Sequence, residues 1–126
     1  MKEIKHYKDL IVWIRSHQLF LDVVKDIEIF PKNIVSRVII DQIVRSVGSI
    51  SSNIAEGFNS MTTRQYLSFI DIARRSSAES ENWFYKLKDI GYLGQDTADK
   101  RINECTELNK MLYGLMNSLK KRTMSR

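Results

Sequence analysis

The sequence contains little that would interrupt or cross-link a polypeptide chain: one proline, five glycines and one cysteine among 126 residues. So few turn-forming residues argue against a fold of many short strands and favour long helices. The single cysteine, Cys105, excludes an internal disulfide and is typical of a reducing compartment. No segment has the roughly 18 to 20 consecutive apolar residues that span a bilayer. Asp9, Arg15 and Asp22 also interrupt the stretch where the core of a signal peptide would lie. We therefore expect a cytoplasmic protein without a membrane segment.

Residue patterns that carry catalysis or bind metals are equally scarce. The two histidines, His6 and His17, have neither a second histidine nor a carboxylate four residues away, which a zincin motif requires. The chain also lacks the pair of Glu-x-x-His motifs used by di-iron bundles, and its glycines do not form a phosphate-binding loop. Cys105 lies among apolar residues at helical spacing, which favours a small buried side chain over a reactive thiolate. We therefore predict no catalytic residue, no metal site and no cofactor.

Four segments carry apolar residues at the three- and four-residue spacing of an amphipathic helix: about 9–29, 34–58, 63–90 and 96–120. In the first segment Asp9 is the expected N-cap, and the predicted inner stripe comprises Leu10, Trp13, Ile14, His17, Phe20, Leu21, Val24 and Ile27. Short connections make successive helices antiparallel neighbours. The pattern predicts an all-α protein, a single up-down-up-down antiparallel four-helix bundle.

The second predicted helix contains an unusual stretch of small residues between Gln42 and Glu56. Serine and glycine are poor helix formers, so packing against a neighbour must stabilise this helix. The third segment has its own small residues between Ala73 and Ser80, which indicates close contact of the two helices or a subunit interface. Polar residues accompany both stretches, either as a solvated face with ordinary ion pairs or as a partly buried inter-helix network. The network residues would be Gln42, Arg45, Ser46, Asn53, Glu56, Ser76 and Glu79.

The formal charge is +5 and the pI is about 9.4, values that suit polyanion binding without requiring it. The positive charge is concentrated at the two ends of the chain, 1–8 and 120–126. Exposed cations on the predicted helices complete the candidate nucleic-acid contacts. The full set is Arg37, Arg64, Arg74, Arg75, Lys86, Lys88, Lys120, Lys121 and Arg122.

Several motifs in order resemble a bacterial family of four-helix bundles, the 23S ribosomal RNA intervening-sequence proteins. They comprise Asp9-Leu-Ile-Val-Trp13, Phe30-Pro31, Gln42-x-x-Arg45-Ser46, Ser52-Asn-Ile-Ala-Glu-Gly-Phe58, then Phe69, Ile72-Ala73, Ser76, Glu79 and Gly91-Tyr-Leu93. The similarity extends to about residue 116, and Arg75 departs from it where the family usually has glycine.

This resemblance implies a ring-like homo-oligomer, specifically a pentamer, with no known catalysis. Relatives include accessory variability proteins of diversity-generating retroelements, which implies a reverse transcriptase as a protein partner. Our first hypothesis is a non-catalytic homo-oligomeric scaffold that binds RNA or DNA without strong sequence specificity. The alternative is a protein-protein interaction adaptor with no nucleic-acid ligand, and a third hypothesis is an enzyme or metal protein.

Overall fold

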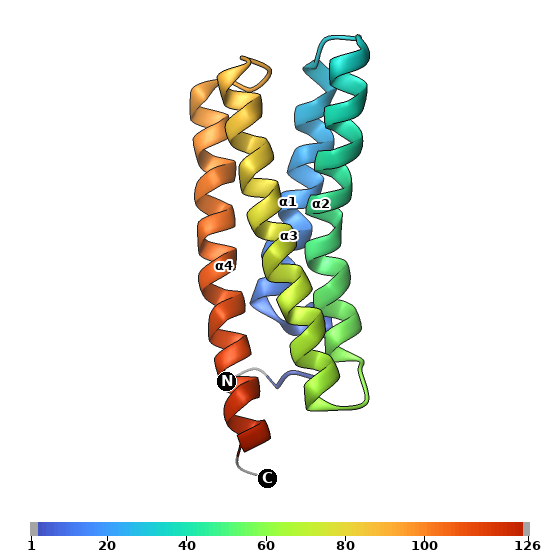
Figure 1. Cartoon of the computed structure of the whole chain (residues 1–126), viewed down its shortest axis with the longest axis vertical. Helices are drawn as coiled ribbons and strands as arrows, with labels where there is room; N and C mark the ends of the chain where they lie inside the picture. Colours follow the sequence, from blue (N-terminus) through green and yellow to red (C-terminus); the bar gives the residue numbers. More distant parts are fainter. Residues whose placement is uncertain (1–2, 125–126) are drawn as a thin grey trace.

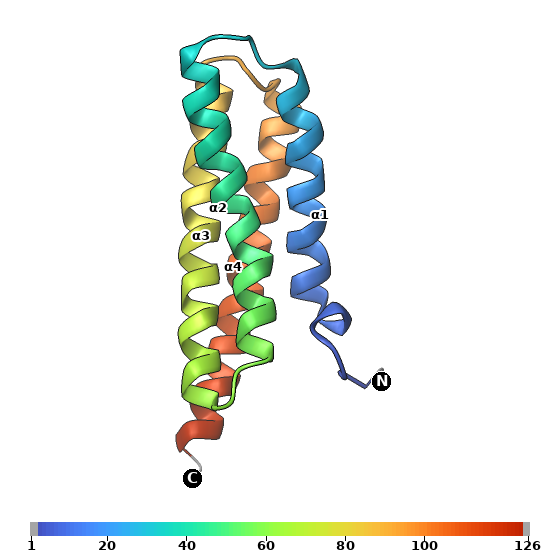
Figure 2. The same ribbon diagram turned by 90° about the vertical axis from the view of Figure 1, so that its right-hand side faces the viewer.

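The computed structural model describes residues 3–124, and these form four long helices connected by short turns (Figure 1). The helices are α1 (Ile11–Asp26), α2 (Ile34–Phe58), α3 (Thr63–Asp89) and α4 (Gln95–Met124). Two short 3-10 helices, η1 (Tyr7–Asp9) and η2 (Ile27–Ile29), flank α1. The helices alternate in direction along one long axis (Figures 1 and 2), which confirms the predicted all-α up-down-up-down bundle. None of the described helices combines the length and apolar content needed to cross a membrane.

Short polar side chains determine where α2 and α3 begin. The Oδ1 of Asn33 accepts a hydrogen bond of 2.9 Å from the N–H of Ser36, and the Oγ1 of Thr62 accepts one of 3.1 Å from the N–H of Gln65. The prediction that Asp9 caps the first helix was wrong. Its carboxylate instead accepts 3.0 Å bonds from the N–H groups of residues 5 and 6 and closes the η1 turn, and α1 begins after Leu10 without a side-chain cap.

The core lies between the buried faces of all four helices, and α2, α3 and α4 supply most of it. On α2 the side chains of Ile43, Val47, Ile50 and Ile54 are fully buried. They pack with buried residues of α3 and α4, among them Ile70, Ala73, Phe84, Leu87, Ala98, Cys105, Leu108, Leu112 and Leu119. The spacing rule therefore identified the inner faces of these three helices.

The predicted inner stripe of α1 was correct only at Leu10, Trp13, Phe20 and Ile27, which pack against the core, because α1 is apolar on more than one face. It buries Val12, Ser16, Leu19 and Val23, whereas Ile14, His17, Leu21 and Val24 of the predicted stripe are exposed. Ser16 weakens the true stripe in the sequence, although the structure accommodates it because its Oγ donates a 3.0 Å hydrogen bond to the carbonyl of Trp13. The result leaves an apolar strip on the outside of the bundle.

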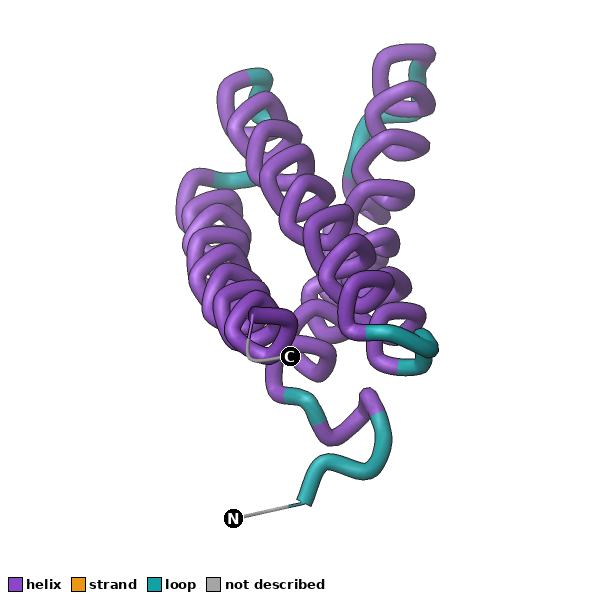
Figure 3. The backbone as a smooth tube through the Cα atoms, turned by 60° about the horizontal axis from the view of Figure 1, so that its bottom comes forward, coloured by secondary structure: helices purple, strands orange, loops and turns teal. Residues whose placement is uncertain are grey.

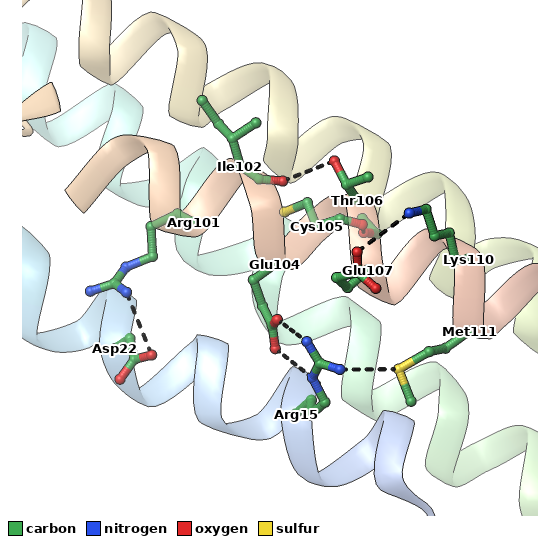
Figure 4. A network of polar contacts seen from close by, with 11 residues as sticks. Arg15, Asp22, Arg101, Ile102, Glu104, Cys105, Thr106, Glu107, Lys110 and Met111 are labelled. Carbon is green, nitrogen blue, oxygen red and sulfur yellow. Dashed lines mark hydrogen bonds and ion pairs between the residues drawn. The ribbon is translucent and has the colours of Figure 1, made fainter. Parts of the chain in front are cut away.

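Ion pairs hold α1 against α4, as Figure 4 shows. The guanidinium of Arg15 forms two hydrogen bonds with the carboxylate of Glu104, one of them 3.0 Å between Nε and Oε2. Arg101 donates bonds of 2.7 and 2.9 Å to Asp26 and lies 3.7 Å from a carboxylate oxygen of Asp22. The hydrogen bonding to Asp26 raises the pKa of Arg101. These pairs fix the position of α1 along its neighbour.

Candidate nucleic-acid interface

The structure distributes the nine predicted cations over three places along the bundle (Figure 1). Three lie where α2 begins and α3 ends, two lie in the middle of α3, and four lie at the opposite end. In that order they are Arg37, Lys86 and Lys88; Arg74 and Arg75; Arg64, Lys120, Lys121 and Arg122.

Carboxylates compensate both arginines in the middle of α3 and Lys88 at its end. Asp71 contacts both mid-helix arginines, at 3.0 Å from Arg74 and 3.5 Å from Arg75. The Nζ of Lys88 lies 2.7 Å from Asp99, and this hydrogen bond raises the pKa of the lysine. Pairing lowers the positive potential that these groups can offer to a phosphate. The middle of α3 is therefore a weaker candidate than its charge in the sequence indicates.

The end of the bundle that carries both chain termini is the most basic region (Figure 3). The N-terminal arm, the α2–α3 turn and the end of α4 all lie at this end, although the arm projects away from the other two (Figure 2). Residues 3–9, 59–65 and 117–123 together contain six cations and two carboxylates. Arg64 and Lys120 form no ion pair with any residue that the structure describes. Lys5 and Lys8 of the arm were missed as candidates, although the net charge of 1–8 already pointed to them. We call this region the basic end.

The serine-rich stretches of α2 and α3 face each other and form a seam of hydroxyl groups. The Oγ atoms of Ser46 and Ser80 are 3.0 Å apart, and those of Ser49 and Ser76 are 2.9 Å apart. Asn53 donates a 2.9 Å bond to the Oγ of Ser49. Small side chains with mutual hydrogen bonds allow the two helices to approach closely without unsatisfied polar groups.

An exposed ion pair covers one flank of this seam. Arg45 lies 3.2 Å from Glu79 and donates a 2.8 Å bond to Gln42, and Glu79 also accepts a 3.4 Å bond from the indole of Trp83. Glu56 is exposed and makes no hydrogen bond or ion pair within residues 3–124. Six of the seven predicted network residues therefore lie in one seam between α2 and α3, and Glu56 lies outside it.

Cys105 is fully buried in the core, and burial raises the pKa of its thiol to about 12. The thiol is therefore protonated at neutral pH and a poor nucleophile. Among the described residues, no three His, Cys, Asp or Glu side chains are arranged to hold a metal ion.

Together these features define an antiparallel four-helix bundle with a hydroxyl-lined seam and a basic end. A family model for 23S rRNA-intervening sequence proteins matches residues 8–114, and the chain belongs to this family. No curated protein matches the sequence. The fold is similar to the crystal structure of a protein of unknown function from the S23 ribosomal protein family of Bacteroides thetaiotaomicron. That similarity has a TM-score of 0.78 at 24% identity and covers 84% of this chain and 98% of the other.

Proposed function

We propose that the protein is a non-catalytic, homo-oligomeric cytoplasmic scaffold that binds RNA or DNA through its basic end. The observation that carries the proposal is that the N-terminal arm, the start of α3 with Arg64 and the last turns of α4 lie at the same end of the bundle (Figure 2). Lysine and arginine side chains on a surface contact phosphates, which are the same in every sequence. Binding should therefore be tolerant of sequence. The family description refers to 23S rRNA, so RNA is the first ligand to test.

The exposed strip of α1 supports the homo-oligomeric part of the proposal. Ile11, Ile14, Leu21 and Val24 are between 40% and 64% exposed on one helix. Extended apolar patches on a protein surface typically mark interaction sites. A ring in which each α1 packs against a neighbouring copy would cover the strip and place all basic ends on one side. The pentamer implied by the family resemblance would multiply the modest charge of each chain fivefold.

The test is the salt dependence of RNA binding, measured by fluorescence anisotropy with a labelled single-stranded oligonucleotide. Affinity should fall at least about 10-fold between about 50 and about 200 mM salt, because each neutralised phosphate releases counterions. A variant with Lys120, Lys121 and Arg122 all replaced by Gln should bind weakly. The matched control replaces exposed Lys25, Lys32 and Lys100, which removes the same charge elsewhere. Absence of binding at low salt, or affinity indifferent to salt, would reject the proposal.

The exposed strip of α1 also favours the second candidate function, an adaptor for another protein without a nucleic-acid ligand. The reverse transcriptase implied by the family resemblance is the first partner to test. Stoichiometric capture of that enzyme, unchanged by nuclease treatment, would support the adaptor over the scaffold. Light scattering of the purified protein before and after nuclease treatment would report both subunit number and bound nucleic acid.

A further inference from the structure

A pocket opens at the basic end, where α2 turns into α3. Its lining is rich in hydrogen-bond donors and contains no carboxylate. The residues that matter for its chemistry are Phe58, Ser60, Thr62, Thr63, Tyr66 and Arg122.

Phe58, the last residue of the motif that includes Asn53, lines one side of this pocket. A Cβ on Gly57 would lie 2.9 Å from the Cδ1 of Tyr66, so only glycine lets the tyrosine ring pack this closely on the end of α2. Phe58 meets the same ring edge-on, with centroids 6.4 Å apart. The Oγ of Ser60 donates a 2.6 Å bond to the carbonyl of Gly57 and holds the turn. These contacts place Tyr66 beside the first turn of α3.

The start of α3 provides the second wall and a favourable electrostatic environment. Thr62 caps this 27-residue helix, and Thr63 and Arg64 occupy its first two positions, where backbone N–H groups have no partner within the helix. The positive end of the helix dipole lies at the same place. Free N–H groups at the start of a long helix are a common site for oxyanions.

One side chain in the pocket lacks a hydrogen-bond partner. Thr63 is only 8% exposed and lines the pocket, yet its hydroxyl bonds to none of the residues that the structure describes. No residue that the structure describes occupies this hydroxyl, so it is available to donate to an oxygen-bearing ligand. Tyr66 is a second potential donor. Burial raises its pKa although Arg122 opposes the rise, so its hydroxyl is protonated at neutral pH.

We propose that this pocket binds a single phosphate group of a nucleic acid. The hydroxyl of Thr63 and the N–H groups at the start of α3 would donate to the phosphate oxygens, and Arg122 would supply positive charge. The source of the phosphate rests on the proposed function, whereas the pocket's affinity for phosphate does not. A free phosphate would satisfy the same donors, so the test has one arm for each source.

In the first arm, inorganic phosphate is titrated into the ¹⁵N-labelled protein at constant ionic strength, with chloride as the exchanged anion. Saturable shifts of the Thr63 and Arg64 amide resonances are expected. They should be lost in Thr63→Val, which keeps the shape of the side chain and the Thr62 cap, and weakened in Arg122→Gln. The control Lys120→Gln removes an equal charge from the same helix outside the pocket and should leave the phosphate shifts in place.

In the second arm, the same variants bind the labelled RNA. Thr63→Val should lower the affinity about 10-fold, the effect of one lost hydrogen bond to a charged group. A thermal melt shows whether the variant is folded, and Tyr66→Phe provides a second substitution that removes only a hydroxyl. The phosphate site is rejected if both Thr63→Val and Tyr66→Phe bind RNA as tightly as the parent and phosphate shifts no amide resonance of the parent protein. The proposed scaffold function would then still stand. Saturable phosphate shifts in a protein that binds no RNA would overturn the nucleic-acid source and the proposed function, while the phosphate site would remain.

Discussion

Replacing Gly57 by alanine adds one methyl group at a close contact between α2 and α3. The new Cβ would lie 2.9 Å from the Cδ1 of Tyr66 and 3.0 Å from the Cβ of Phe69. Overpacking of this kind costs about 1 to 3 kcal/mol because the surrounding side chains must shift. The higher helix propensity of alanine offsets up to about 1 kcal/mol of this cost. The offset is smaller at Gly57 because the helix ends at the next residue. We expect Gly57→Ala to lower the free energy of unfolding by about 1 to 2 kcal/mol.

Gly114 provides the matched control, because it lies inside α4 and a Cβ added there would meet nothing within 4 Å beyond the backbone of its own helix. Gly114→Ala should raise stability by about 0.5 to 1 kcal/mol through propensity alone. The two substitutions are chemically identical. If they change the free energy of unfolding in urea in opposite directions, the difference comes from the contact of Gly57 with α3. For a chain of this size each kcal/mol corresponds to roughly 3 to 5 °C in melting temperature. Measurements at two protein concentrations separate folding from assembly. A Gly57→Ala protein as stable as the parent would refute the close-contact argument.

Three further substitutions or measurements test the structure elsewhere. Arg101→Met should cost about 2 to 4 kcal/mol in urea unfolding because it leaves Asp26 without its partner, and adding Asp26→Leu should recover part of that loss. Cys105 should not react with a thiol reagent at pH 8 until denaturant is added. Since its folded pKa of about 12 exceeds the ordinary thiol value of 9.0, its contribution to stability should be complete below pH 9 and decline as pH rises toward 12. Asn53→Ala should cost about 1 kcal/mol through its lost hydrogen bonds, whereas Glu56→Ala should stay within about 0.5 kcal/mol.

The sequence predicted the architecture well because α2, α3 and α4 each have one apolar face. On α2 the exposed apolar residues Ile34, Val35 and Val38 are confined to the first turns, and further along the helix only the stripe through Ile43 continues. On α1 two stripes compete, and hydrophobicity alone favours the one through Ile14 and Leu21, which the fold leaves exposed. Periodicity identifies a helix, but it cannot choose between faces when the helix also presents an apolar surface outward.

The residues of the candidate site were harder to predict than the fold, because the ion-pair partner of a cation can be distant from it in the sequence. Lys88 pairs with Asp99 from the next helix, so its charge could not be judged from α3 alone. The start of α3, which carries Arg64, lies beside the end of α4 only because the helices are antiparallel. Thr63 carries no motif that marks it as a ligand residue, and its unpartnered hydroxyl is visible only in three dimensions.

The segment from Gly57 to Tyr66, which joins the end of α2 to the start of α3, has two separable roles. Gly57 serves packing, since it admits the ring of Tyr66, whereas Thr63 and Tyr66 line a pocket that packing alone does not require. A purely structural motif would tolerate Thr63→Val, because shape and capping are preserved. A phosphate site would not tolerate it, since the donor is lost while the fold remains. Thr63→Val should therefore lower phosphate binding and leave stability unchanged, whereas Gly57→Ala should lower stability and also displace the ring of Tyr66 at the pocket.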